Sequence, residues 1–281
     1  MSVMKRLKTD GVEVTYLDQG KGPLVIIAHC SSASHKEWLP LIGELAPDWR
    51  VLAPDFIGYG QSGAWPEGKV FTGQADLGVL LELANKTEKP IYLAGHSHGA
   101  ALALEAARGL GSKVQSLTLV EPVAFNLLRT ERRPEWAEIE QLGIAVLTAV
   151  SNGNDRDAAA VFMRYWLGRL RWWLSPEKFK AAITATIRKV ALEFMILIEK
   201  GARLSDYTSV TASDLADRRR QHPRSRPRRG RHAERGAPQY HHDRAQRRGP
   251  YEPVHPSFRG EPAHRRPSRR SAPMSAVSSG S

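Results

Sequence analysis

The stretch "IYLAGHSHGAALALEAA", residues 91–107, decides the fold of this chain. It opens with an apolar run typical of a buried strand, and it closes with apolar residues at the three- and four-residue spacing of a helix. Between the two lies Gly-His-Ser-His-Gly, with Ser97 at its centre and with Gly95 and Gly99 two residues away on either side. Glycine at those positions lets a strand turn sharply into a helix without side-chain collisions. We therefore expect a strand, a tight turn at Ser97 and then a helix.

The residues around this stretch repeat the same alternation of strand and helix. Short apolar runs rich in β-branched residues end at Gly, Pro or polar clusters, and segments with helical spacing separate them. Buried strands that alternate with helices form a mostly parallel sheet covered on both faces. We expect an α/β, doubly wound fold, with residues 1–125 as the first part of its core. The expected strands are residues 23–29, 49–55, 90–96 and 114–122.

Residues 126–205 change to a mostly helical pattern. We interpret them as a helical lid inserted into the core, and residues 206–216 as the start of the return to the core. The lid segment contains several aromatic residues that suit either a substrate pocket or the packed interior of the lid. General burial preferences favour the interior. These residues are Phe162, Tyr165, Trp166, Trp172 and Trp173.

The excess positive charge lies entirely near the end of the chain, whose formal net charge is +12. Residues 217–281 hold 17 arginines, no lysine and five acidic residues, whereas residues 1–216 hold 24 basic and 24 acidic residues. This tail shows no periodicity and is rich in Arg, Pro, His, Ser and Gly, which predicts disorder. Its arginines would also contact nucleic acid without reading the base sequence.

Cysteine usage and hydropathy bear on the compartment. Cys30 is the single cysteine, so the chain forms no internal disulfide and fits a reducing compartment. The sequence has no run of about 18 apolar residues, and no apolar stretch follows the basic residues near its start. We expect a cytoplasmic protein without a membrane span.

Ser97 has the sequence setting that a nucleophilic serine requires. A serine hydroxyl attacks a carbonyl efficiently when a base removes its proton and N–H donors stabilise the oxyanion. A loop of small polar residues follows the first predicted strand in "VIIAHCSSASHKEW", residues 25–38, and glycines mark a tight turn in "DFIGYGQSG", residues 55–63. With these motifs together, residues 10 to about 212 resemble the α/β-hydrolase fold family, and specifically its lidded serine hydrolases.

The resemblance implies a role for four residues. Ser97 would be the nucleophile, and the backbone N–H groups of Ser31 and His98 would form the oxyanion hole. Glu121, at the end of the strand predicted over residues 114–122, would be the acid that orients the base; a solvated or helix-capping carboxylate is the alternative. Cys30 stands where the family usually has glycine. The resemblance implies no metal and no organic cofactor.

The resemblance also limits the class of reaction that we expect. Dehalogenases and epoxide hydrolases of this fold are expected to carry aspartate at the position of Ser97. The serine favours hydrolysis of an ester or similar acyl bond in a small, partly apolar substrate, with a cofactor-free haloperoxidase-like enzyme or a carbon–carbon bond hydrolase as alternatives. A nucleic-acid-binding or scaffolding protein that acts through the arginine-rich tail is the alternative from a different class.

The base that Ser97 needs should follow the acid in the chain, near the C-terminus. The histidines of the tail adjoin no predicted strand or helix: they are His222, His232, His241, His242, His255 and His264. Read one nucleotide later, however, residues 248–256 permit Gly-Ala-His-Met-Ser-Pro-Phe-Thr-His, and residues 213–217 permit Pro-Thr-Leu-Leu-Ile. These resemble the histidine loop and the next core strand of the family. We expect that residues from about 212 onward result from a frameshift that removed the base and impaired the enzyme; a genuine disordered extension is the alternative.

Overall fold

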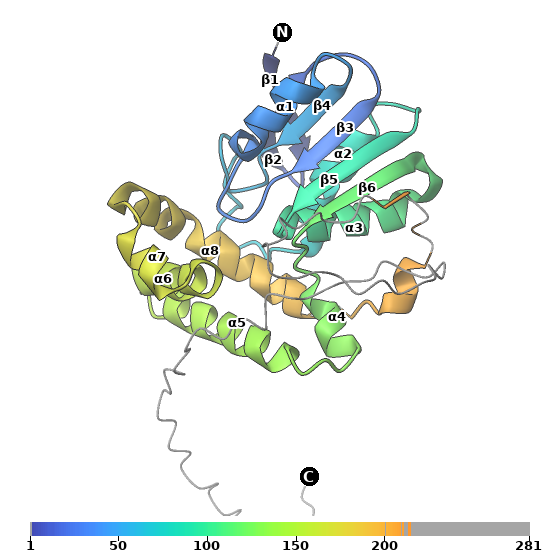
Figure 1. Cartoon of the computed structure of the whole chain (residues 1–281). Coiled ribbons are helices and arrows are strands. Elements are labelled where there is room, and N and C mark those ends of the chain that lie inside the picture. The colour runs from blue at the N-terminus through green and yellow to red at the C-terminus, as the bar shows by residue number, and fades with distance from the viewer. Residues whose placement is uncertain (1, 200, 209, 211–212, 215–281) are drawn as a thin grey trace, which may run out of the picture. The chain divides into compact units, whose positions relative to one another are not determined.

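The computed structural model describes residues 2–199, 201–208, 210 and 213–214. The predictions made for the tail, residues 217–281, lie outside the described residues. The described part forms a mixed, mostly parallel sheet with helices on both of its faces, which confirms the predicted α/β architecture (Figure 1).

The sheet formed by the described residues has the strand order β1-β2-β4-β3-β5-β6-β7. β1 pairs with β2 and β2 pairs with β4 in antiparallel fashion, and every other neighbouring pair is parallel. The bounds are β1 (Ser2–Thr9), β2 (Val12–Gln19), β3 (Leu24–Ala28), β4 (Arg50–Pro54), β5 (Ile91–His96), β6 (Val114–Val120) and β7 (Ser213–Asp214). The strands β3 to β6 are those that the sequence predicts, each within about two residues.

The β1–β2 hairpin is missing from the sequence-based prediction. Its turn is the pair Asp10 and Gly11, with φ angles of 49° and 86°. Two residues in the left-handed region are what a two-residue hairpin turn requires, and Asp-Gly is a preferred pair for it. The buried residues Val12, Val14 and Tyr16 alternate along β2. The Asp-Gly pair before an alternating strand was therefore the signal that would have identified this hairpin.

Alternation along β3 divides the core between the two faces of the sheet. Ile26 packs into one cluster of buried residues, together with side chains from α2 (Gly73–Ala84) and α3 (His98–Leu110). Val25 and Ile27 point the other way and pack with Ile42 of α1 (Leu39–Leu45). Because successive side chains of a strand face opposite sides, an uninterrupted apolar run such as β3 needs helices on both faces.

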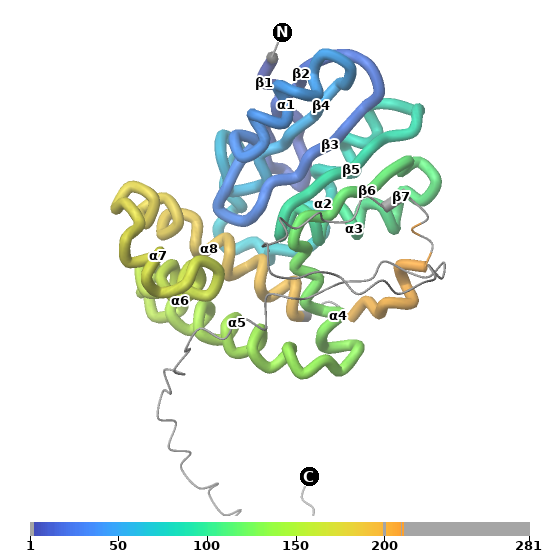
Figure 2. The backbone as a smooth tube through the Cα atoms, in the orientation of Figure 1, coloured from blue at the N-terminus to red at the C-terminus, as the bar shows by residue number. Residues whose placement is uncertain are grey.

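After β6 the chain leaves the sheet and forms a separate group of helices before it returns at β7 (Figure 2). The helices are α4 (Phe125–Thr130), α5 (Trp136–Ser151), α6 (Asp155–Leu167), α7 (Arg169–Leu174) and α8 (Glu177–Glu199), and 3-10 turns elsewhere are η1 (His35–Trp38), η2 (Gly111–Lys113) and η3 (Leu204–Tyr207). Among the aromatic residues, Phe162 and Trp172 are buried in the interior of this group, and Tyr165 and Trp166 pack against it. Trp173, by contrast, is 72% exposed.

The strand order reverses between β3 and β5, because the chain runs from β3 to β4 on one side and then continues with β5 on the other. In open α/β sheets ligands bind at such a reversal, beyond the carboxyl ends of the strands. The loops that follow β3 and β5 contain Ser31 and Ser97. The topology therefore brings both segments to the same edge of the sheet.

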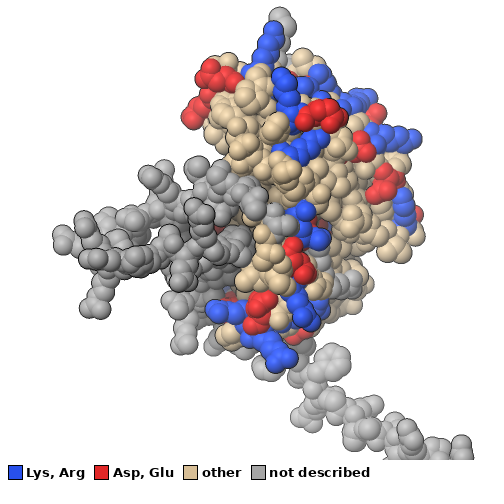
Figure 3. Space-filling view, turned by 90° about the vertical axis from the view of Figure 1, so that its right-hand side faces the viewer, with Lys and Arg blue, Asp and Glu red and all other residues tan. Residues whose placement is uncertain are grey.

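The described surface carries both signs of charge. Basic and acidic side chains are interspersed over the face that Figure 3 shows, with neither sign gathered into one patch. This distribution agrees with the equal numbers of basic and acidic residues before residue 217. None of the helices within the described residues combines the length and the apolar character of a membrane span.

Candidate active site

Ser97 lies at a strained turn between β5 and α3. Its φ and ψ angles are 54° and −116°, which few residues other than glycine adopt. The Ser97 N–H donates to the carbonyl of Val120 over 2.9 Å, and the Ser97 carbonyl accepts from the N–H groups of Ala100 and Ala101, each at 3.1 Å. Strain of this kind costs about 1–3 kcal/mol and persists where the surroundings fix it, often at functional sites.

The two glycines beside the turn are required by contact with backbone. A Cβ atom on Gly95 would lie 2.4 Å from the carbonyl oxygen of Gly99. A Cβ atom on Gly99 would lie 2.4 Å from the carbonyl oxygen of His29. Helix α3 therefore begins directly against β5 and the end of β3. The close packing that the Gly-x-Ser-x-Gly spacing predicts is present.

Each histidine of the described residues is engaged away from Ser97. His29 is buried; its Nε2 accepts from the Phe56 N–H over 3.0 Å, and its Nδ1 lies 2.7 Å from the Cys30 carbonyl oxygen. His35 pairs with Asp55, with 2.8 Å between Nδ1 and Oδ1. His96 and His98 face carboxylates that are described below. Among the described residues, no imidazole is hydrogen-bonded to the Ser97 hydroxyl.

The loop after β3 places Ser31 beneath the helices that follow β6. The Ser31 hydroxyl donates to Oε2 of Glu193 on α8 over 2.5 Å. Ser32, the next residue, has a φ of 60° and accepts a hydrogen bond from the Thr186 hydroxyl over 2.8 Å. Two residues of α8 therefore hold the segment whose backbone N–H the sequence assigns to the oxyanion hole. His98, the source of the second assigned N–H, is the first residue of α3, where backbone N–H groups lack partners within the helix.

Glu121 follows β6 directly and has a φ of 45°. Its side chain is 47% exposed, and its Oε2 lies 3.8 Å from Nε2 of His96. The family resemblance implies that Glu121 is the acid that orients a histidine, with a solvated or helix-capping carboxylate as the alternative. The structure places it at the carboxyl end of the strand next to β5, facing the residue that precedes Ser97.

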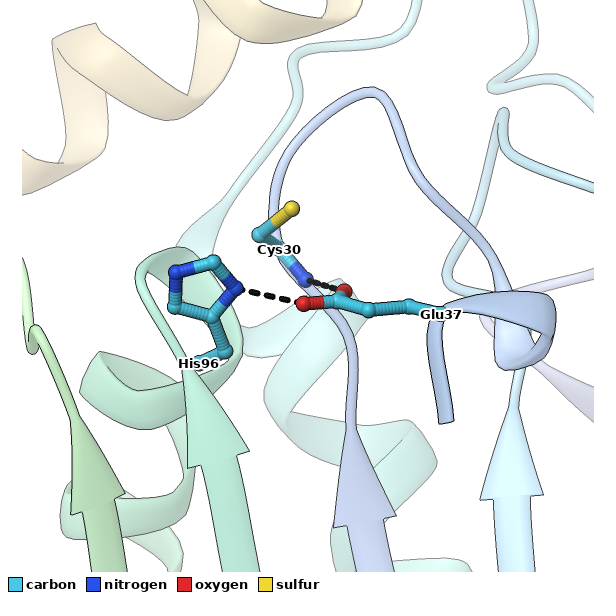
Figure 4. Close-up of side chains that lie close together, drawn as sticks. All are labelled: Cys30, Glu37 and His96. Carbon is cyan, nitrogen blue, oxygen red and sulfur yellow. Dashed lines mark hydrogen bonds and ion pairs between the residues drawn. The ribbon is translucent and has the colours of Figure 1, made fainter. Parts of the chain in front are cut away.

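Three side chains meet on the outer side of the turn and form what we call the outer cluster: Cys30, Glu37 and His96 (Figure 4). Glu37 Oε1 lies 2.5 Å from His96 Nδ1, and Glu37 Oε2 accepts from the Cys30 N–H over 2.8 Å. Burial works to raise the pKa of Glu37, but the bond to His96 lowers it overall. Burial works to lower the pKa of His96, but Glu37 and then Glu121 raise it overall. Burial, with Glu37 nearby, raises the pKa of the Cys30 thiol far above its usual range.

A second group, the inner cluster, lies on the buried side of the turn and consists of Asp76, His98, Lys189 and Glu193. Lys189 Nζ bridges Asp76 at 2.6 Å and Glu193 at 2.8 Å, and His98 Nε2 lies 3.5 Å from Asp76 and 3.6 Å from Glu193. Burial works to raise the pKa of Asp76, but Lys189 and His98 lower it to about 2. The inner cluster therefore holds buried charges that compensate one another.

No sequence motif singled out Glu37, Asp76, Lys189 or Glu193 as site residues. Lys189 and Glu193 are spaced by four residues on α8, a spacing that usually marks a solvated pair on a helix surface. The only available signal was that apolar residues surround both of them in "IRKVALEFM", residues 187–195. Such a setting places a charged pair on the buried face of a helix.

Comparisons with known proteins give one family. A model of the alpha/beta hydrolase fold matches residues 23–185. The chain is 24% identical over 216 residues to a pyrrolizixenacetamide deacetylase of Xenorhabdus hominickii, which covers 71% of this chain and 76% of that protein. It is 30% identical over 147 residues to an epoxide hydrolase of Caballeronia sordidicola, which covers 48% of this chain and 45% of that protein.

Solved structures share the fold. A hydrolase from Pseudomonas aeruginosa PA01 aligns with a TM-score of 0.60 at 22% identity, over 76% of this chain and 78% of that chain. An alpha/beta hydrolase from Sphaerobacter thermophilus DSM 20745 aligns with a TM-score of 0.54 at 19% identity, over 75% of this chain and 80% of that chain.

Proposed function

Because the chain belongs to the α/β hydrolase fold family, we propose that it derives from a serine hydrolase of an ester or similar acyl bond in a small, partly apolar substrate. The observation that carries the proposal is the backbone of Ser97, held at a φ of 54° between β5 and α3. A strained strand-to-helix turn exposes the side chain at its apex above the sheet. The deacetylase relative supports an acyl substrate, because deacetylation cleaves an acyl bond.

The residue at the turn separates this proposal from the other relatives. Epoxide hydrolases and haloalkane dehalogenases are among them. The resemblance leads us to expect aspartate at the turn in such enzymes, whose carboxylate attacks carbon directly. This chain has Ser97, whose hydroxyl needs a base and an oxyanion hole and therefore suits attack on a carbonyl.

The resemblance to the family gives each of these residues a role. Ser97 Oγ would attack the carbonyl carbon as a base takes its proton, and the N–H groups of Ser31 and His98 would stabilise the oxyanion that forms. The base would then return the proton to the leaving group. Glu121, at the end of β6, would orient the base. Hydrogen bonds from α8 hold the Ser31 loop in place for this purpose.

The histidine base would have been lost through a shift of reading frame near residue 212. β7 marks the place of the next core strand, because Ser213–Asp214 pairs in parallel with β6, and the shifted frame permits a strand sequence from the same position. Three of the four histidines of the described residues hydrogen-bond to other groups, and His98 Nε2 faces Asp76 and Glu193 at 3.5 and 3.6 Å. A chain without the base would retain roughly 10³-fold catalysis over water from the oxyanion hole and binding.

Labelling with a fluorophosphonate tests Ser97 as the nucleophile. The chain as given should react slowly, and a version with one nucleotide deleted near codon 212 should react rapidly. Peptide mapping should place the label on Ser97, and Ser97→Ala should remove it. Labelling of the Ser97→Ala protein at the original rate would contradict the assignment. In the restored protein, Glu121→Gln should lower kcat by roughly 10²-fold or more.

The coding DNA tests the frameshift without any protein. Gly249 must be encoded by GGC, Pro250 by CCA, Tyr251 by TAT and Glu252 by GAG, because only these codons give Ala-His-Met-Ser one nucleotide later. Any other codon for Pro250 removes the histidine from the shifted frame. The tail would then be a genuine extension.

A further inference from the structure

The outer cluster brings three different metal-binding groups to one point. Cys30 follows β3, His96 ends β5 and Glu37 comes from η1, and the three side chains lie close together beyond the ends of the two strands (Figure 4). The ligand atoms, which are a sulfur, a nitrogen and a carboxylate oxygen, all lie within 4.8 Å of one another. The Cys30 sulfur points away from the other two groups in Figure 4, so a change of its side-chain rotamer would bring it to a shared ion. All three residues are partly exposed.

The surroundings of His96 match those of a metal-bound histidine. Its Nδ1 faces Glu37 within the cluster, and its Nε2 lies 3.8 Å from Oε2 of Glu121. A histidine that coordinates a metal through one ring nitrogen usually gives its other N–H to a carboxylate outside the first shell. Glu121 lies outside the cluster and on the correct side of the ring for this role.

We propose that the outer cluster binds a thiophilic divalent cation, with Zn²⁺ as the best fit, through Cys30 Sγ, Glu37 Oε1 and His96 Nδ1. Zn²⁺ takes this combination of sulfur, nitrogen and oxygen ligands in tetrahedral geometry, and three protein ligands leave one position open for water. The proposal rests on the cluster itself and does not depend on the function of Ser97.

The geometry requires small movements of side chains. With zinc bonds of about 2.0 Å to nitrogen and oxygen and about 2.3 Å to sulfur, ligand atoms in a tetrahedral site lie roughly 3–4 Å apart. Glu37 Oε1 and His96 Nδ1 are now 2.5 Å apart, so the ion would separate them slightly as it replaces the proton between them. The Cys30 N–H holds the other carboxylate oxygen of Glu37 at 2.8 Å, which leaves Oε1 to the metal. The cation would be the largest local charge and would displace the thiol proton to solvent.

Cobalt titration of the full, metal-free chain under anaerobic, reducing conditions tests the site. Co²⁺ at the outer cluster should produce a thiolate-to-cobalt charge-transfer band in the near ultraviolet, saturating at one equivalent, and Zn²⁺ should remove it. Because Cys30 is the single cysteine, this band can come from no other position in the chain. Zn²⁺ binding should also release the Cys30 thiol proton to the medium, a readout that needs no variant.

Variants distinguish metal binding at the outer cluster from metal binding by the histidines of the tail. Cys30→Ser should abolish the band. Glu37→Gln and His96→Asn should each weaken Co²⁺ binding by more than the roughly 10- to 100-fold expected for Glu121→Gln, an outer partner. The control His264→Asn should leave the band unchanged. The absence of a thiolate band in the unchanged chain would overturn the proposal. So would a Co²⁺ affinity in Glu37→Gln and His96→Asn equal to that of the unchanged chain.

Discussion

The two histidines beside Ser97 lie in opposite surroundings. The side chain of His96 is 28% exposed and belongs to the outer cluster, whereas that of His98 is 4% exposed and belongs to the inner cluster. Both face two carboxylates, yet only the inner cluster contains a buried lysine. The turn thus sends side chains two residues apart toward water and toward the interior. An ion pair contributes little to stability in the exposed outer cluster and much in the buried inner cluster, because the protein interior screens charge poorly.

Replacing Lys189 in the inner cluster should lower the free energy of unfolding more than any other change proposed below. Lys189→Met leaves Asp76 and Glu193 buried without their shared cation, and loss of one partner of a buried ion pair costs about 3–5 kcal/mol. The free energy of unfolding in urea measures the loss.

Its neighbour on α8 provides the control for this change. Arg188 pairs with Asp155, and its side chain is 65% exposed. Arg188→Met should cost less than about 1 kcal/mol. Equal losses for the two variants would show that burial does not distinguish the inner cluster from a surface pair.

A side chain added at the Ser97 turn should cause the next largest loss of stability. In Gly99→Ala the added Cβ would lie 2.4 Å from one backbone oxygen and 2.5 Å from another, so the helix start must shift. We expect a loss of about 1–3 kcal/mol in the free energy of unfolding. Gly109→Ala, in the last turn of the same helix, meets no atom within 4 Å and should leave stability unchanged or raise it by up to about 1 kcal/mol. Gly99→Ala without loss of stability would contradict the close packing at Ser97.

Acid should weaken the inner cluster through Asp76. The pKa of Asp76 is lowered to about 2 in the folded chain, so its charge stabilises the fold above about pH 4. This contribution, roughly 2 kcal/mol, is lost as the pH falls from about 4 toward 2. Urea unfolding between pH 6 and pH 2 should therefore show a shallower decline for Asp76→Asn than for the unchanged chain. Parallel declines would mean that Asp76 does not titrate with folding.

The contribution of the outer cluster to stability should change as the pH rises, and this change should be the smallest of those predicted. The folded chain raises the pKa of His96, so protonated His96 stabilises the fold below about pH 6.5, and this stabilisation is lost as the pH rises through the higher folded pKa. Because the cluster is partly exposed, we expect a change below about 1 kcal/mol. Urea midpoints from pH 6 to 9, with a chelator present, should fall for the unchanged chain and stay level for His96→Asn. A fall of equal size in the variant would assign the change to another group.

Local patterns predicted the turn at Ser97, because every requirement lies within the single stretch of residues 91–107. The apolar strand, the two glycines and the helix are neighbours in the chain, so their spacing carries the information. The same reasoning placed Glu121 at a strand end. It could not place Glu121 opposite His96, since that depends on how β5 and β6 pair.

The clusters could not be predicted because their members come from distant segments. Glu37 and His96 are 59 positions apart, and Lys189 and Asp76 are 113 apart. Sequence spacing carries no information about such contacts, which arise only when distant segments pack together at the ends of the strands. Even the Lys189–Glu193 pair has the spacing of an ordinary surface salt bridge.

Two buried charged side chains of helix α8 contact the core, and these contacts restrict how the helix can move away from it. Lys189 and Glu193 are one turn apart, and Lys189 has a partner in α2 while Glu193 has one in the loop after β3. A half-lifted helix would separate these charges before water could replace their partners, which is the costliest arrangement for buried ions. Intermediate positions are therefore unfavourable, and α8 should leave the inner cluster in one cooperative step rather than by gradual loosening.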